Sequence, residues 1–392
     1  MLCVNSWGGS MSEWSRVPLA SVLDFREGPG IMAADFRAEG VPLLRLSGLK
    51  RDGNLLSGCN YLDPEMVEQR WSHFRVRKGD VLLSTSASLG EVAVVDAPAV
   101  GAIPYTGLIG FRPKDGRVDP AFIPLMLREQ SFKDQIEAMG VGSVMKHFGP
   151  THLKLMTVTL PPRPEQQAVA EVLGALDDKI AANTALISLT AQNAAAIVGG
   201  GPCQDVPLAD VALFHNRRRI PLSASQRDAR PGNVPYYGAN GRLATVDGAL
   251  FDEPLVLLGE DGSVVRDDGS PFVHYIWGPA WVNNHAHVLT GAGLSTELLH
   301  VVLTRSKVDT LVTGAVQPKL SMGNAKRISV RIPDRSRLAV VDRQVCALFA
   351  SRRAATEECR TLTETRDALL PQLMSGKLRV RDAERIAVDA GL

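Results

Sequence analysis

An internal repeat constrains the fold of this chain more than any other feature. The segment VPLASVLDF at residues 17–25 recurs as VPLADVALF at residues 206–214, with six of nine positions identical. A chain of 392 residues is also long enough for two domains. A duplicated segment usually marks a duplicated architecture. The sequence therefore predicts two globular halves that are built alike.

Each half continues with short apolar runs that are bounded by turn residues. Runs at 79–84 and 93–95 in the first half, and at 254–259 and 286–289 in the second, are typical of buried or half-buried strands. Helical patterns follow at 120–139 and 295–313. A polar loop that begins with glycine and contains a lysine comes next, and then a strand that ends in proline. The predicted fold class is mixed α/β (α+β).

A long helix follows each half. Apolar or small residues recur there at alternating steps of four and three, which is the spacing of a coiled-coil seam. The seam positions are Val169, Leu173, Leu176, Ile180, Asn183, Ile187, Thr190, Ala194 and Ile197 in the first helix, and Val341, Val345, Leu348, Arg352, Ala355, Cys359, Leu362, Arg366 and Leu369 in the second. Helices of about 35 residues would each span roughly 50 Å.

The order globule, helix, globule, helix predicts an antiparallel helical pair related by a pseudo-twofold axis. The expected layout is a globular half at 1–162, a spacer helix at 163–200, a second globular half at 201–334, and a distal helix with a C-terminal tail at 335–392. The first helix should stop at the glycine-rich linker 199–202, and the second near Pro371 or Gly376. The alternative is that the helices close the core of one large domain.

Composition excludes several classes of protein. The N-terminal residues lack the apolar segment of a secretory signal, and no window approaches about 18 uninterrupted apolar residues. The five cysteines are scattered and form no C-x-x-C pair, so neither a disulfide framework nor a zinc ribbon is expected. We therefore expect a cytoplasmic protein without a membrane segment. The formal net charge is only +1, so any contact with nucleic acid must depend on local patches or partners.

Motifs for catalysis are weak throughout the sequence. No complete phosphate-binding loop is present, and Asn233–Tyr236 only faintly resembles the Asn-Pro-Pro-Tyr loop of amino-methylating enzymes. A Pro-Tyr turn that packs on a strand is the favoured interpretation of that segment. His285 and His287 could share a strand face, as metal ligands do, but hydrogen-bonded structural histidines are favoured. Glu260–Ser263 is interpreted as a turn in preference to an acidic metal loop.

Polar loops are the best candidates for function. Serine, glutamine, lysine and backbone amides are groups that bind phosphates and base edges of DNA. The two glycine-led loops occupy matched places in the two halves, and a basic run begins at Arg217, where a solvated surface is the alternative. The predicted DNA contacts are Ser143, Lys146 and His147 in the first half, and Arg217, Arg218, Gln317, Lys319 and Ser321 in the second.

The residues at the start of the first helix resemble a known family. PPRPEQQAVAEVLGALDDKIAAN, from Pro161, is similar to the central conserved region of DNA-specificity subunits of type I restriction-modification systems. TRDALLPQLMSGKL, from Thr365, resembles their distal conserved region. Glu260–Gly262 and Trp281–Leu289 resemble one of their target-recognition-domain types. In the second copy the Pro-x-x-Glu-Gln motif is degraded, and Leu338 stands at the position of Gln166.

The resemblance implies a non-catalytic subunit. Each globular half would be a target recognition domain for one half-site of a bipartite, asymmetric double-stranded DNA target. Two methyltransferase subunits would bind the helices, and restriction subunits can join the complex. S-adenosylmethionine, and ATP with Mg²⁺, would belong to these partners, and the chain itself would need no cofactor or metal. The predicted partner contacts are Gln166, Asp177, Asn183, Arg366 and Asp367. Recognition for a different DNA-modifying or phage-defence effector, or a scaffold without DNA binding, remains open.

Overall fold

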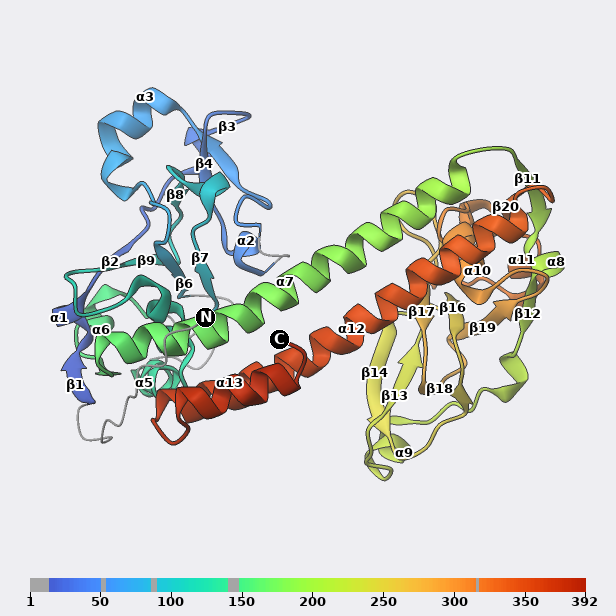
Figure 1. The fold of residues 1–392 in the computed structure, drawn as a ribbon. Helices are drawn as coiled ribbons and strands as arrows, with labels where there is room; N and C mark the ends of the chain where they lie inside the picture. Colours follow the sequence, from blue (N-terminus) through green and yellow to red (C-terminus); the bar gives the residue numbers. More distant parts are fainter. Residues whose placement is uncertain (1–13, 51–53, 86–89, 140–147, 315–316) are drawn as a thin grey trace. The chain divides into compact units, whose positions relative to one another are not determined.

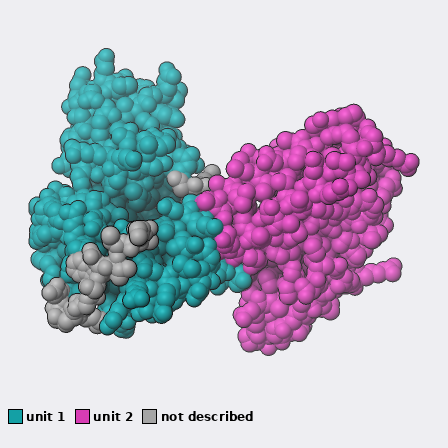
Figure 2. Space-filling model, viewed as in Figure 1, with its two compact units in different colours: residues 1–181, 360–392 teal, residues 182–359 magenta. Residues whose placement is uncertain are grey.

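A computed structural model describes residues 14–50, 54–85, 90–139, 148–314 and 317–392. It divides into two compact units, one formed by residues 1–181 and 360–392 and the other by residues 182–359 (Figure 2). Each of the two long helices begins in one unit and ends in the other. The alternative of one large domain closed by the helices is therefore wrong, because two separate units form.

Unit 1 contains two four-stranded sheets. The central sheet is antiparallel with the order β2-β9-β6-β7, and the second sheet has the order β3-β5-β4-β8, with β4 and β8 parallel (Figure 1). A short ribbon pairs β1 with β10. The strands are β1 Ser15–Pro18, β2 Leu23–Glu27, β3 Phe36–Arg37, β4 Val41–Leu44, β5 Asn60–Leu62, β6 Val81–Ser84, β7 Val92–Val94, β8 Ile103–Pro104, β9 Leu108–Pro113 and β10 Thr157–Leu160. The helices are α1 Leu19–Val22, α2 Leu46–Lys50, α3 Pro64–Met66, α4 Ile123–Arg128, α5 Gln130–Met139 and α6 Pro150–Leu153.

Unit 2 repeats the central sheet and the ribbon of unit 1, whereas its second sheet has a different edge strand. Its central sheet has the order β12-β19-β16-β17, its second sheet the order β14-β13-β18-β15 with β13 and β18 parallel, and its ribbon pairs β11 with β20. The strands are β11 Cys203–Pro207, β12 Ala212–Phe214, β13 Val234–Gly238, β14 Gly241–Val246, β15 Phe251–Asp252, β16 Leu255–Gly259, β17 Val273–Ile276, β18 Pro279–Val282, β19 Ala286–Gly291 and β20 Ser329–Pro333. The helices are α8 Leu208–Val211, α9 Ala224–Asp228, α10 Thr296–Thr304 and α11 Met322–Lys326.

The repeated nine-residue segment forms the same structure in both units. In each copy a strand of the ribbon leads through one helical turn into the first strand of the central sheet. A backbone hydrogen bond is also shared: Leu19 N donates to Met156 O in unit 1, and Leu208 N donates to Ile328 O in unit 2. The predicted mixed fold with an internal repeat is therefore confirmed.

The two long helices are α7 Arg163–Gly199 and α12 Leu338–Met374. In unit 1 the first half of α7 shares a core with the second half of α12, and Asp177 Oδ1 lies 2.8 Å from Arg366 Nη1. In unit 2 the second half of α7 faces the first half of α12, and Asn183 Nδ2 lies 2.7 Å from Glu358 Oε2. The helices therefore pair antiparallel, as expected.

Helix α12 ends at Met374, between Pro371 and Gly376, as expected from the sequence, and Gly376 has a φ of 67°. Other helices differ from the sequence prediction. An additional helix, α13 (Val380–Asp389), then packs on the core of unit 1 through Ala383 and Ala387. The helix predicted at 295–313 ends at Thr304, and the one predicted at 120–139 is divided into a 3₁₀ turn, α4 and α5. Among the described residues no helix is long and apolar enough to cross a membrane.

Candidate nucleic-acid interface

A polar cluster lies at one edge of the central sheet of unit 2, where β16 ends and β19 begins. We call it the β16 cluster, and it consists of Asn216, Arg219, Glu260, His287 and Lys319. The strand register explains why distant residues meet here: Leu258 pairs with His287 and Gly259 pairs with Ala286, so that Glu260 emerges beside the start of β19. Asn216 arrives from the turn that follows β12.

His287 is the buried centre of this cluster. Its side chain is fully buried, and its Nε2 lies 2.8 Å from Leu320 O. Asn216 Nδ2 lies 2.8 Å from Nδ1, while Asn216 Oδ1 accepts from Val288 N. Because a carbonyl only accepts and this amide nitrogen only donates, the proton of the neutral ring belongs on Nε2. Burial lowers the pKa of His287, which keeps the ring neutral.

The two histidines therefore differ in role. His287 is a hydrogen-bonded structural histidine, as favoured from the sequence. His285 lies exposed in the turn before β19, so the expected shared strand face does not form. Within the described residues there is no group of three or more side chains placed to hold a metal ion. Glu260–Ser263 forms the favoured turn, and Gly262 adopts a φ of 87° there.

Arg219 joins the separate segments of the β16 cluster. Its Nη1 lies 2.6 Å from Glu260 Oε2 and 2.7 Å from Ala286 O, and its Nε lies 3.0 Å from Asn216 O. Both charged side chains are mostly buried, with 13% of Arg219 and 17% of Glu260 exposed. A buried guanidinium with a carboxylate and two carbonyls is well satisfied, so it holds these loops in one arrangement.

The basic run 217–219 therefore has three different environments. Arg217 is exposed, and no partner for it exists among the described residues. Arg218 bonds Glu253 at 2.7 Å and lies over the ring of Phe251 at 4.2 Å. Arg219 is internal. The sequence singled out Arg217 and Arg218 but missed Arg219, because one run of arginines carries no signal of which side chain turns inward.

The loop that contains Gln317 and Ser321 contributes Lys319 to the β16 cluster. Leu320 N donates to Glu260 O, and Gly262 N donates to Pro318 O. Lys319 Nζ lies 3.3 Å from Asp261 Oδ2 and is half exposed. Ser321 caps α11 by accepting from Asn324 N, and Gln317 is exposed. The structure thus brings the predicted lysine loop and the predicted arginine run to the same edge of the sheet.

Two further arginines lie over aromatic rings of the neighbouring sheet. Arg227 lies 5.2 Å from the ring centroid of Tyr236, and Arg230 lies 4.7 Å from that of Trp281. Tyr236 is 1% exposed, and its hydroxyl lies 2.9 Å from Leu222 N. The favoured interpretation of Asn233–Tyr236 as a Pro-Tyr turn is wrong, because Pro235 and Tyr236 lie within strand β13, although the tyrosine does pack in the core.

At the corresponding edge of unit 1 the backbone hydrogen bonds are equivalent but the side chains differ. Thr85 N donates to Gly107 O, as Glu260 N donates to His285 O in unit 2. Thr85 therefore occupies the place of Glu260, and its buried hydroxyl has no hydrogen-bond partner in the described chain. The predicted contacts Ser143, Lys146 and His147 lie outside the described residues.

The predicted partner contacts on the helices are engaged within their own units. Gln166 is 1% exposed, and its amide accepts from Asp119 N and donates to Pro161 O and Arg117 O. The structure gives this side chain an internal role instead of a surface for a partner. Asp177, Asn183, Arg366 and Asp367 also make intramolecular contacts. Their contact with a partner stays a prediction.

The degraded motif of the second copy has a structural replacement. In unit 1, Gln166 binds Asp119, the residue that caps the turn before α4. In unit 2, Leu338 cannot do this, and Asp342 accepts from the backbone and hydroxyl of Ser295, the cap of α10. Each long helix thus holds the start of the helix that follows the central sheet.

The two units share their central sheet and ribbon topology, and part of the chain matches known proteins. Residues 11–190 match the type I restriction modification DNA specificity domain. A Haemophilus influenzae protein named as a type I restriction enzyme specificity subunit is 33% identical over 138 residues, which are 35% of each chain. The protein named as the MjaX specificity subunit of Methanocaldococcus jannaschii is 30% identical over 172 residues, which are 43% of this chain and 37% of that one.

A solved structure has the same fold. The type I restriction-modification S subunit from M. genitalium superposes with a TM-score of 0.61 at 17% identity, covering 94% of this chain and 98% of that one. The matched segments span little more than one third of the length of the two curated relatives. Residues 11–190 of this chain are thus similar to the DNA specificity domain of type I restriction-modification systems, and the chain shares the fold of an S subunit.

Proposed function

We propose that this chain is the non-catalytic DNA-recognition subunit of a type I restriction-modification complex. Each unit would contact one half of a split, asymmetric DNA site, and methyltransferase subunits would dock on α7 and α12. S-adenosylmethionine, and ATP with Mg²⁺ where a restriction subunit is present, would be bound by those partners. The observation that carries the proposal is the duplicated fold, with a cluster of charged and polar side chains at one edge of the central sheet of unit 2.

The β16 cluster supports this assignment for unit 2. Its interior is fixed by the Arg219–Glu260 pair and by neutral His287, while Lys319 of the cluster and the neighbouring Arg217 and Gln317 are exposed. Exposed lysine and arginine can neutralise phosphates, and glutamine can bond to base edges. A rigid support with polar groups at its rim is the arrangement that sequence discrimination requires.

Salt dependence of DNA binding tests the proposal. The full chain is assembled with a methyltransferase subunit from the same organism, and the affinity of the complex for duplex DNA is measured across salt concentrations. Arg217→Gln should weaken binding to all sequences and reduce the slope of log K against log salt by about 0.9, the value for one phosphate. Arg381→Gln, an equal charge change on α13, serves as the control and should have no effect.

Two results would contradict the proposal. If the assembled complex shifts no duplex at any salt concentration, the scaffold alternative is favoured. If it binds DNA but Arg217→Gln and Arg381→Gln behave alike, the assignment of this sheet edge as the interface is wrong.

A further inference from the structure

One long helix ends in each unit, and the charged side chains beside its C-terminal end have opposite signs in the two units. In unit 2 this is the end of α7, where two arginines bind the last carbonyls. Arg305 Nη1 lies 2.9 Å from Ala195 O, and Arg337 Nη2 lies 3.1 Å from Ile197 O. Cations are stabilised there, because the final carbonyls of a helix lack intrahelical partners and carry partial negative charge.

In unit 1 both arginines are replaced by glutamates. Arg305 is the residue directly after α10, and the residue directly after α4 is Glu129. Leu338 and Gln166 occupy equivalent positions, because Leu338 N donates to Asp334 O and Gln166 N donates to Pro162 O. The residue before Leu338 is Arg337, and the residue before Gln166 is Glu165. The topology therefore places two carboxylates near the end of α12 where unit 2 has two guanidinium groups.

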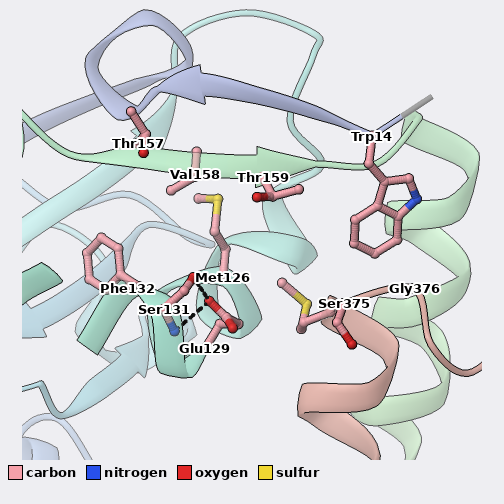
Figure 3. A pocket seen from close by; sticks show the side chains of 11 residues that line it. Trp14, Met126, Glu129, Ser131, Phe132, Thr157, Val158, Thr159, Ser375 and Gly376 are labelled. Atoms are coloured by element: carbon pink, nitrogen blue, oxygen red, sulfur yellow. Dashed lines mark hydrogen bonds between the residues drawn. The ribbon is translucent and has the colours of Figure 1, made fainter. Parts of the chain in front are cut away.

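A cavity of about 360 Å³ lies at this end of α12 (Figure 3). Glu129 lines it together with Ser131, the apolar side chains Met126 and Met374, and the indole of Trp14. Glu165 fixes that indole, since Trp14 Nε1 lies 3.0 Å from Glu165 Oε2. A carboxylate, an aromatic ring and apolar walls together suit a guanidinium on its aliphatic stem.

The described chain provides no cation for this cavity. Among the described residues no lysine or arginine forms an ion pair with Glu129, whose Oε2 accepts from Ser131 N at 2.9 Å. Arg16 lies near, but its Nε bonds Thr157 Oγ1 at 2.7 Å. Residues 1–13 contain no lysine or arginine.

We propose that this cavity of unit 1 binds an arginine side chain of a partner protein. The guanidinium would pair with Glu129 and lie against Trp14, in the place that Arg305 and Arg337 fill from within the chain in unit 2. The proposal does not depend on DNA recognition. The cavity is acidic and apolar, unlike the basic surface that would contact DNA, and its test uses no DNA.

Binding of a capped amino acid to the full chain tests this inference. The probe is Nα-acetyl-arginine methylamide, and the citrulline analogue, which has the same shape without the charge, is the matched ligand. By calorimetry or NMR titration we expect a dissociation constant for the arginine probe in the millimolar range, and binding of the citrulline analogue that is at least about tenfold weaker.

Three variants distinguish binding in this cavity from nonspecific attraction of the arginine probe to acidic side chains. Glu129→Gln should weaken the arginine probe about tenfold, whereas Glu137→Gln, an exposed carboxylate on α5 of the same unit, should not change it. Glu129→Arg should abolish binding, because the chain would then supply its own guanidinium as in unit 2. Circular dichroism checks that each variant is folded. Equal affinity for the two probes, no binding of either, or undiminished binding by Glu129→Arg would overturn the proposal.

Discussion

Replacing Arg219 with methionine removes the charge that joins the loops of the β16 cluster while keeping most of the aliphatic stem. Losing one partner of a fully buried ion pair costs about 3–5 kcal/mol, because the other charge stays buried and unpaired. Here 13% of Arg219 and 17% of Glu260 are exposed, so partial hydration reduces this cost. We expect Arg219→Met to lower the free energy of unfolding by about 2–3 kcal/mol.

The matched control is Arg230→Met in the same unit. Arg230 pairs with Asp247 at 2.8 Å, but 39% and 48% of these side chains are exposed, so water screens the interaction. Loss of this screened pair and of the contact between Arg230 and the ring of Trp281 should together cost about 1 kcal/mol. Urea titrations followed by tryptophan fluorescence and circular dichroism compare the two variants. Glu260→Gln combined with Arg219→Met should restore part of the loss, because no buried charge remains unpaired.

Two results would refute this account of the cluster. If Arg219→Met costs no more than Arg230→Met, the pair does not hold the loops together. If Arg219→Met destabilises the unit yet leaves the preference of the assembled complex for its DNA site unchanged, the cluster is structural support without a role in discrimination.

Three further predictions concern stability and DNA contact. His300 is half-buried, its buried Nδ1 has no hydrogen-bond partner in the described chain, and burial of the ring lowers its pKa to about 3. Below its ordinary pKa the unfolded chain takes up a proton that the folded chain does not, so lowering the pH from 7 to 5 should cost about 2 kcal/mol through this residue. In urea titrations at both pH values, His300→Phe should remove that part of the loss, and an unchanged pH dependence would refute it. Gln166→Leu, which copies Leu338, leaves buried backbone groups near Asp119 unpaired and should lower the free energy of unfolding by about 1–3 kcal/mol; a smaller loss than for an exposed site such as Gln167→Leu would contradict the internal role. Lys319→Gln frees Asp261 from its ion pair and should weaken DNA binding beyond the loss of one phosphate contact, measured as above; binding equal to that of the unchanged chain would exclude Lys319 from the interface.

Features that depend on local periodicity could be predicted from the sequence. The start and end of α7 follow from its apolar spacing and the glycine-rich linker, and the seam residues Val169, Leu173 and Leu176 are buried. Two positions of the predicted seam are arginines, and each has a different kind of partner. Arg366 pairs with Asp177, and Arg352 lies over the ring of Phe349.

Features that depend on contacts between distant segments could not be predicted. The β16 cluster exists because Leu258 pairs with His287, a register that no local pattern specifies. The inward turn of Arg219 depends on Glu260 and Ala286, which are more than 40 residues away. Helix α10 ends at Thr304 although the apolar pattern continues, and Ser306, just beyond it, bonds back to Val302 O.

Comparison of adenine methylation in host DNA with this gene intact and deleted tests the central claim most directly. Single-molecule sequencing that detects N6-methyladenine provides the measurement. If the chain selects the DNA site of a type I complex, deletion should remove methylation at one split, asymmetric motif and leave other motifs methylated, and the motif would identify both half-sites. A methylation pattern that is unchanged by the deletion would contradict the claim.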